Sequence, residues 1–240
     1  MKGVILAAGK GTRLRPITLE IPKPLIPVQK KPVISHLAEL FWLHRINDIK
    51  IIINKEHESD FKFWLDHQLN RKIAEHTSLV VEDDRTGTFG PLFLYLRDWL
   101  DEPTVVSNGD ELKEIDLTEF HTFHKKNRST TTIGLIKVPN PQDYGVAMID
   151  NTNRIIDFIE KPKDPPSTYI NSGIYIINPE VLELYPKNAT FAMLERDLFP
   201  HLARQGKLYG FKWEGHWYDC GTFERWEDAI NNWPQSIKTN

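Results

Sequence analysis

Residues 5–16, "ILAAGKGTRLRP", place two glycines and two arginines directly after an apolar start. Ile5 and Leu6 are typical of the end of a buried strand, and glycine lets the backbone turn sharply or lie close to a ligand. Arginine binds phosphate oxygens in a bidentate fork. Seven of the first 31 residues are basic and one is acidic, so this loop is predicted to be an anion site. The alternative is a glycine-rich turn with solvated charges.

Two common phosphate-binding loops do not match this segment. The P-loop spacing G-x-x-x-x-G-K-[ST] does not occur, and the dinucleotide fingerprint needs a third glycine where Leu14 stands. The segment G-x-G-T-R-L-R-P is followed instead by "IPKP", in which Pro22 and Pro24 would hold the backbone of Lys23 stiffly. Arg13 and Lys23 are therefore the candidates for binding a polyphosphate.

Two aspartates follow segments that resemble strands. Asp110 comes after the apolar run "TVVSNG", and Asp219 comes after the aromatic run "HWY". Mg²⁺ is usually held by one or two carboxylates together with substrate phosphates and water, so both residues have a suitable type and position. Either residue alone could equally belong to a turn, because "NGD" and "DCGT" are good turn sequences.

The elements that must position these residues alternate between strands and helices. The expected strands are short, continuous apolar runs, typical of strands buried on both faces: 3–8, 49–54, 78–82 and 104–108. The expected helices have apolar residues at helical spacing: 33–46, 58–69 and 90–100. This order predicts an α/β fold with a doubly wound, mostly parallel, Rossmann-like sheet. Ligands bind such sheets outside the carboxyl ends of the strands.

The pattern changes near residue 130. Four strand-like segments follow in close succession, "TTTIGLIKV", "YGVAMID", "RIIDFIEKP" and "NSGIYIIN", and helical patterns return at 190–204 and 222–233. They predict a β-rich lobe laid on the sheet. The chain has no repeat or long linker, so residues 1–240 are expected to form one domain.

The opening segment and its continuation, "LAAGKGTRLRPITLEIPKPLIPVQKKPVI", resemble the signature of the sugar-1-phosphate nucleotidyltransferases, also called nucleotide-sugar pyrophosphorylases. Short motifs in the same order extend the resemblance along the chain: "NGD" at 108–110, "YG" at 144–145, "EKP" at 160–162, "NSGIY" at 171–175 and "DCGTFE" at 219–224. The resemblance implies Mg²⁺-dependent transfer of a nucleotidyl group from a nucleoside triphosphate to a sugar 1-phosphate. It also implies a nucleotide-binding part over 1–129, and a sugar-binding lobe with a C-terminal helix over 130–240.

The same resemblance assigns roles to individual residues. It implies catalytic roles for Arg13, Lys23 and Asp110, and metal binding by Asp110 and Asp219. The implied nucleotide-binding residues are Leu6, Ala8, Gly9, Gly11, Thr12, Arg13, Lys23, Gly87, Thr88, Asn108 and Gly109. The implied residues for the sugar and its phosphate are Gly145, Glu160, Lys161 and Asn171.

The segment implied to contact the base departs from the family pattern. Family members often have an "L-G-T-A-G" type segment, whereas residues 86–90 read "TGTFG". The glycines remain, so backbone contacts to a base are expected to persist, and Phe89 is expected either to stack near the base or to pack beneath the loop. The base therefore stays open at this point.

Two branches of the family, and two other classes of protein, are alternatives. The motifs "LAAG" and "NGD" favour the guanylyl branch, which uses GTP with mannose or heptose 1-phosphate, over a thymidylyl- or uridylyltransferase for glucose 1-phosphate. A catalytically silent subunit that senses nucleotide sugars is disfavoured, because Arg13, Lys23, Asp110 and Asp219 are all present. A glycosyltransferase of similar fold is disfavoured because the chain contains no D-x-D motif.

Composition sets the remaining expectations. The formal charge of -3 argues against nucleic acid, and the single cysteine, Cys220, excludes an internal disulfide. The chain has no apolar run long enough to span a bilayer and no secretory pattern at its start, so a cytoplasmic protein without a membrane partner is expected. The nine histidines show no metal-binding spacing, and His121 and His124 are expected to be at the surface or half-buried. The partners are expected to be small-molecule substrates, and the sequence is compatible with a homo-oligomer.

Overall fold

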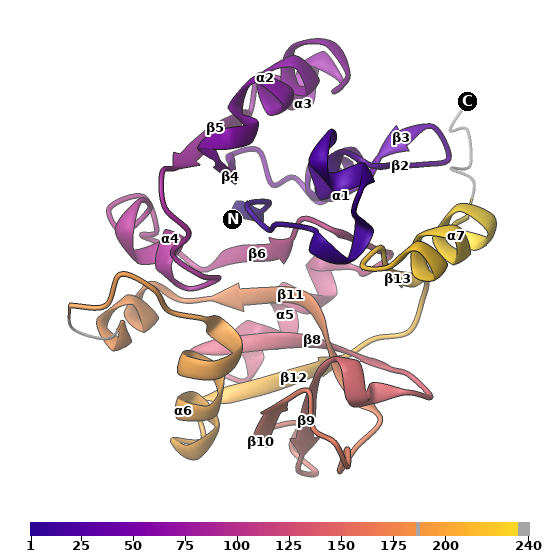
Figure 1. Cartoon of the computed structure of the whole chain (residues 1–240). Coiled ribbons are helices and arrows are strands. Elements are labelled where there is room, and N and C mark those ends of the chain that lie inside the picture. Colours follow the sequence, from indigo (N-terminus) through magenta and orange to yellow (C-terminus); the bar gives the residue numbers. More distant parts are fainter. Residues whose placement is uncertain (186–187, 235–240) are drawn as a thin grey trace.

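The computed structural model describes residues 1–185 and 188–234, and residues 235–240 of the expected domain lie outside this part. The described residues form a nine-stranded mixed sheet in the order β10-β9-β11-β6-β1-β4-β5, with β8 attached to β11 and β12 attached to β8. Figure 1 shows the parallel strands in one half of the molecule and the β-rich lobe in the other. The α/β class with a central parallel sheet is confirmed.

The first half of the sheet has four parallel strands. They are β1 (Lys2–Leu6), β4 (Ile49–Asn54), β5 (Thr77–Glu82) and β6 (Thr104–Asn108). β1 lies between β4 and β6 and pairs with both in parallel. The carboxyl ends of β1 and β6 therefore lie side by side, and the loops that follow them share one edge of the sheet.

The β-rich lobe continues this sheet instead of lying on it. Its strands are β8 (Thr131–Lys137), β9 (Gly145–Ile149), β10 (Ile155–Glu160), β11 (Tyr169–Ile177) and β12 (Leu208–Lys212). β11 runs antiparallel to β6 on one side and to β8 on the other. The two parts expected from the sequence thus share backbone hydrogen bonds.

Alternating side chains of the strands supply two buried clusters, one on each face. Ile5 of β1 packs in the cluster that contains residues of α1 (Val33–Leu43), α2 (Glu58–His67), α3 (Arg71–Ala74) and α5 (Leu117–Lys126). Val4 packs in the cluster with residues of α4 (Gly90–Leu94) and α6 (Phe199–Arg204). A period-two alternation with helices on both faces is what a doubly wound sheet requires.

Short elements complete the molecule. β7 (Glu111–Lys113) pairs antiparallel with β13 (Trp217–Asp219), and β2 (Pro27–Val28) pairs with β3 (Lys31–Pro32). α7 (Phe223–Asn232) follows β13 and contributes Ala229 to a third cluster, together with Leu14 and Leu112. This cluster fastens the end of the described chain to the loop after β1.

Several expected elements differ in the structure. The helix expected at 90–100 ends at Leu94, and turns bury Leu96 and Leu100 instead. The helix expected at 190–204 begins as a π-helical turn over Leu194–Leu198 and becomes α6 at Phe199. No helix among the described residues has the length and apolarity needed to cross a membrane.

The expectation that His124 is at the surface or half-buried is wrong. The residue lies on α5, which the sequence analysis did not identify, and it is 2% exposed. Its Nε2–H donates to Oδ1 of Asn178 at 2.9 Å, and its Nδ1 accepts from Oγ1 of Thr132 at 2.8 Å. Two polar partners satisfy the ring within the core, and burial lowers the pKa of His124.

Candidate active site

A cavity of about 450 Å³ lies at the carboxyl ends of β1 and β6. Its lining includes ten of the eleven residues that the resemblance assigns to the nucleotide: Leu6, Ala8, Gly9, Gly11, Thr12, Arg13, Lys23, Gly87, Thr88 and Asn108. Asp110 also lines it. Residues from four separate stretches of sequence therefore meet in one cavity.

Glycine is required at two places where backbone segments meet beside this cavity. Gly11 has a φ of 58°, and a Cβ there would lie 2.9 Å from Cγ2 of Thr18 and 3.1 Å from Cβ of Lys23. Gly109 does not line the cavity; its N–H donates to the carbonyl of Leu6, and a Cβ would lie 2.8 Å from that oxygen. Gly11 thus lets the first loop approach the Lys23 segment, and Gly109 joins the ends of β1 and β6.

The ammonium of Lys23 lies between the two candidate metal ligands. It bonds to Oδ2 of Asp110 and is 3.7 Å from Oδ1 of Asp219, and its side chain is 9% exposed. The other oxygen of Asp219 accepts from Nη1 of Arg225 at 2.8 Å. Burial opposes charge on Asp110, but the ammonium of Lys23 outweighs burial and lowers the pKa of this carboxyl. Burial likewise opposes charge on Lys23, but Asp110 and Asp219 outweigh it and raise its pKa, so both groups remain ionised near neutral pH.

The donor set at this position fits a hard divalent cation. The two aspartates come together because β7 and β13 pair: Asp219 is opposite Glu111, and the N–H of Cys220 donates to the carbonyl of Asp110 at 3.2 Å. Among the described residues, no three His, Cys, Asp or Glu side chains converge as a complete metal site. Two carboxylates that need phosphate oxygens and water to complete the coordination match the preference of Mg²⁺.

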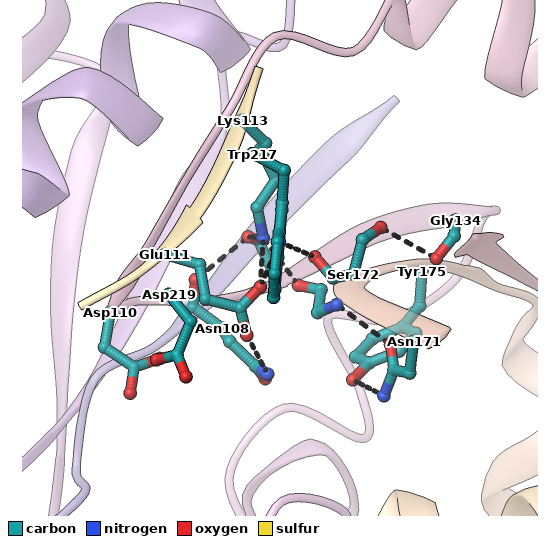
Figure 2. Close-up of polar contacts among 12 residues, drawn as sticks. Asn108, Asp110, Glu111, Lys113, Gly134, Asn171, Ser172, Tyr175, Trp217 and Asp219 are labelled. Carbon is teal, nitrogen blue, oxygen red and sulfur yellow. Dashed lines mark hydrogen bonds and ion pairs between the residues drawn. The ribbon is translucent and has the colours of Figure 1, made fainter. Parts of the chain in front are cut away.

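An ion pair that was not predicted from the sequence lies beside the two aspartates (Figure 2). Lys113 is enclosed, and its ammonium donates to Oγ of Ser107 at 3.1 Å and to the carbonyl of Gly173 at 3.0 Å; it is 3.4 Å from Oε2 of Glu111. Glu111 also accepts from Nδ2 of Asn108 and from Nε1 of Trp217, both at 2.9 Å. Burial raises the pKa of Glu111 and lowers that of Lys113. The stretch "ELK" carries no sequence signal for this role, because such a triplet is typical of an exposed strand.

The four residues implied to bind the sugar lie outside the cavity lining, in the β-rich lobe. Gly145 and Glu160 are register partners in the β9–β10 pair, and a Cβ on Gly145 would lie 3.0 Å from Oε2 of Glu160. Burial raises the pKa of Glu160, and Nζ of the exposed Lys161 is 3.8 Å from Oε1 of Glu160. Asn171 is nearly buried on β11, and its Nδ2 donates to the hydroxyl of Tyr175 at 2.8 Å.

The segment 86–90 resolves the two alternatives stated for Phe89. Phe89 is fully buried and packs edge-on against Tyr185, with ring centroids 5.3 Å apart, so it lies beneath the loop. Gly87 has a φ of 89°, and a Cβ there would lie 2.2 Å from the carbonyl of Ala192, which accepts from the N–H of Phe89 at 2.9 Å. The loop is therefore held from below by residues near 192.

Two acidic residues of the cavity were not predicted. Glu82 ends β5 and accepts from Oγ1 of Thr86 at 2.9 Å, and burial raises its pKa. Glu195 accepts from Oγ1 of Thr88 at 2.6 Å, and burial raises its pKa as well. Both carboxylates line the cavity, and only the fold brings Glu195 to it.

Comparison with known proteins identifies the relatives of the chain. A family model described as "Nucleotidyl transferase" matches residues 2–236. The chain is 38% identical over 226 residues to a mannose-1-phosphate guanyltransferase of Yarrowia lipolytica and to that of Saccharomyces cerevisiae. It is 37% identical over 225 residues to mannose-1-phosphate guanylyltransferase 1 of Arabidopsis thaliana. These matches cover 92% of this chain and 61% of each relative, so the chain spans about three fifths of the length of these curated relatives.

Solved structures show the same fold. One, assigned as a glucose-1-phosphate thymidylyltransferase of Bacillus anthracis in complex with sucrose, matches with a TM-score of 0.86 and 31% identity over 96% of this chain and 94% of that one. A UDP-glucose pyrophosphorylase complexed with UDP-glucose matches with a TM-score of 0.81 and 25% identity, over 96% of this chain and 97% of that one.

Proposed function

We propose that this chain, which belongs to the nucleotidyl transferase family, transfers a nucleotidyl group from a nucleoside triphosphate to a sugar 1-phosphate. The products would be a nucleoside-diphosphate sugar and pyrophosphate. The observation that carries the proposal is the position of Lys23, between Asp110 and Asp219, in a cavity that the glycine loop also lines.

The proposed reaction exchanges one phosphoric anhydride bond for another. An oxygen of the sugar phosphate forms a bond to the α-phosphorus of the nucleotide. The bond from that phosphorus to the bridging oxygen of the β-phosphate breaks, and pyrophosphate leaves with the electron pair. The nucleophile is largely dianionic near neutral pH because its second pKa is about 6. It therefore needs positive charge and alignment from the protein, and no general base.

The first loop and Lys23 supply these requirements. Arg13 and Lys23 both line the cavity, and the backbone N–H groups of Gly9 and Gly11 can donate to phosphate oxygens. Arg13 is exposed at the rim, where a Cβ on Gly221 would lie 2.8 Å from its Nη2. In the proposed reaction, its guanidinium would contact an incoming phosphate there.

Asp110 and Asp219 would hold a Mg²⁺ ion together with phosphate oxygens and water. When bound, the ion would supply charge neutralisation for the triphosphate. The short pairing of β7 with β13 keeps the two carboxylates together, and Arg225 fixes the orientation of Asp219.

On the sugar side, the proposal assigns contacts to the β-rich lobe. The carboxylate of Glu160 would accept hydrogen bonds from sugar hydroxyls, and the side chain of Asn171 and the backbone of Gly145 would contact the sugar. Lys161 would bind the phosphate of the sugar. The exposed ammonium of Lys161 and the half-buried carboxylate of Glu160 have the chemistry that these contacts need.

GTP is the proposed nucleotide, with a mannose- or heptose-type 1-phosphate as its partner. The relatives named as mannose-1-phosphate guanylyltransferases support this choice, as does the cavity. Glu82 presents a buried carboxylate beside Gly87 and Thr88. A carboxylate accepts two parallel hydrogen bonds, and guanine has two adjacent N–H donors, at N1 and N2, where thymine and uracil have one.

The alternative within the family is transfer of a thymidylyl or uridylyl group to glucose 1-phosphate, which the two solved structures favour through their names. The deciding experiment measures pyrophosphate release for GTP, ATP, dTTP and UTP, each with mannose, heptose and glucose 1-phosphates. The proposal expects the highest kcat/KM with GTP and a mannose-type substrate. A higher value with dTTP or UTP would select the alternative, and no release with any pair would indicate a silent binding subunit.

A further inference from the structure

The ion pair Glu111–Lys113 lies between the nucleotide side and the sugar side of the proposed site. Figure 2 shows it between Asp110 and Asp219 on one side and the Asn171–Tyr175 stretch on the other. The contacts of Glu111 lead to Asn108, which lines the cavity, and those of Lys113 lead to Gly173 on β11. No residue of this pair lines the cavity itself.

The stretch of β11 that the pair contacts is a bulge. Asn171 pairs with Leu135 of β8 and Tyr175 pairs with Ile133, so the register shifts between them. Gly173 at its centre has a φ of 62°, and a Cβ there would lie 2.3 Å from Oε1 of Glu111. The bulge therefore fits directly against the carboxylate of Glu111.

The bulge determines where Asn171 points. The N–H of Gly173 donates to Oδ1 of Asn171 at 2.9 Å, while the carbonyl of Gly173 accepts from Lys113 at 3.0 Å. Nε1 of Trp217 donates both to Glu111 at 2.9 Å and to the carbonyl of Ser172 at 3.3 Å. Gly173 thus connects Lys113 to the amide of Asn171, and the Ser172–Gly173 peptide unit connects Trp217 to the same amide.

We propose that Glu111 and Lys113 are a positioning pair that holds Asn108, on the nucleotide side, and Asn171, on the sugar side, in a fixed mutual arrangement. This inference rests on the proposed function for the identity of the two substrates. The pair contacts neither substrate; it acts through Asn108 and through the bulge at Gly173.

Stability alone does not account for an enclosed ion pair here. Replacing such a pair by apolar residues of similar volume is often neutral or stabilising, whereas removing one partner leaves an uncompensated buried charge. The contacts of this pair run to residues of the site, so its loss is expected to displace those residues even where the fold tolerates the change.

The test compares Glu111→Met, Lys113→Met and the double variant. Each single variant is expected to lower the midpoint of thermal unfolding, and the double variant is expected to restore most of that loss because it removes both charges. If the pair had only a structural role, the double variant would recover the wild-type KM for the sugar 1-phosphate together with its stability. A positioning pair would not: the double variant is expected to keep a KM for the sugar 1-phosphate about tenfold above wild type, the scale of one lost hydrogen bond.

A milder variant tests the same contact if the double variant does not fold. Trp217→Phe removes the indole N–H that donates to Glu111 and to Ser172, together with part of the ring volume, and it is expected to raise the sugar KM severalfold. The matched control is Trp64→Phe, which removes an indole N–H that donates to Oγ of Ser35 at 2.8 Å in the buried core. The control is expected to lose stability without any change in KM.

Calorimetric binding of GDP-mannose separates this inference from the proposed function. If the wild-type protein releases no pyrophosphate but binds GDP-mannose, the proposed activity is wrong. The variants are then compared by their affinity for GDP-mannose, and the positioning role predicts that the double variant binds it more weakly than wild type. A double variant with wild-type stability and wild-type sugar KM, or wild-type affinity, overturns the positioning role. So does an equal effect of Trp64→Phe and Trp217→Phe on KM.

Discussion

Lys23 is enclosed by two carboxylates that would repel each other without it. Its side chain is 9% exposed, and its ammonium contacts Asp110, in the turn before β7, and Asp219, at the end of β13. Lys23 and Pro24 lie in a short 3-10 helical turn over Lys23–Leu25, which Pro22 precedes as the N-cap, and Lys23 is buried against Gly11 of the first loop. A lysine held this rigidly loses little further freedom when it binds a phosphate.

Removing either of the two basic groups of the cavity is expected to weaken transition-state binding. Lys23→Ala and Arg13→Ala should each lower kcat/KM for the nucleotide. The loss should correspond to about 2–4 kcal/mol of transition-state stabilisation, the scale for one preorganised charge donor. Steady-state kinetics with the best nucleotide measure the effect. Exposed Arg15→Ala, on the same loop but outside the cavity lining, serves as the comparison. Values within twofold of wild type for Lys23→Ala or Arg13→Ala would contradict their role in binding phosphate.

Removing one of the two carboxylates proposed to bind the metal is expected to abolish most turnover. Asp110→Asn or Asp219→Asn should lower kcat by orders of magnitude, because an amide neither carries the charge nor binds Mg²⁺ as well as a carboxylate. Circular dichroism should show that both variants remain folded. Activity with EDTA provides a second measurement, and full turnover there or in either variant would contradict the metal assignment.

At this scale, residues of the first loop could be predicted from the sequence and the ion pair could not. The glycines, Arg13, Lys23 and Asp110 lie in motifs whose residue types already indicate phosphate chemistry. Glu111 and Lys113 look like exposed charges until β7 is enclosed by Trp217 of β13, a contact across 106 positions of the chain. Charge alone does not show whether a neighbour far along the chain will bury it.

At the scale of elements, the segment 86–90 depends on packing beneath it. Ala192 bonds to both ends of this segment: its N–H donates to the carbonyl of Thr86 at 2.9 Å, and its carbonyl accepts from the N–H groups of Phe89 and Gly90. Phe89 fills the space below, against Tyr185. The shape of this loop is thus determined by the backbone of Ala192 and by the buried ring of Phe89, which lie beneath the surface proposed to contact the base.

Phe89→Ala is therefore expected to act on the base indirectly. The cavity it leaves should cost about 3–5 kcal/mol of unfolding free energy, as for other buried Phe→Ala changes, and a looser loop should reduce the preference for GTP over dTTP. Urea unfolding and the ratio of the two kcat/KM values measure these effects. Phe120→Ala, on the opposite face of the sheet, should lose comparable stability and keep the ratio; an unchanged ratio in Phe89→Ala would contradict the role of the loop.

Strands were predicted better than helices for a physical reason. The run at 49–54 matches β4, and 104–108 matches β6, because a strand buried on both faces is continuously apolar. The pattern at 90–100 also repeats at helical spacing, but α4 ends at Leu94, and turns bury the later apolar residues. α5 was missed because most of its residues are polar. Of its residues, only Leu117, Phe120 and His124 are buried.

The whole molecule is expected to lose stability in mild acid through histidines that are buried or half-buried. Burial lowers the pKa of His36, His121 and His124 below 6.5. Between the lowered pKa and 6.5 the unfolded chain binds more protons than the folded one, so unfolding becomes more favourable as pH falls. The contribution is fully present above pH 6.5 and is lost as the pH falls below it.

The midpoint of thermal unfolding should therefore decrease from pH 7 to pH 5. His124→Phe should show a smaller decrease, because it removes one of these groups along with its bonds to Thr132 and Asn178. His67→Gln, at an exposed position, is the comparison and should follow wild type. A His124→Phe curve parallel to the wild-type curve would show that His124 does not contribute.

The place of β11 in the sheet has a consequence for how the chain reaches this structure. β6 pairs with β1 on one side and with β11 on the other, where Ile174 is opposite Ser107. The second edge of β6 is therefore covered only after β11 has been added. During synthesis, the four parallel strands β1, β4, β5 and β6 would therefore emerge before β11 and leave β6 with an open edge. An open edge can pair with another chain. Contacts between distant residues also slow folding. We expect early chains to depend on rapid arrival of β11, or on a chaperone, to avoid aggregation.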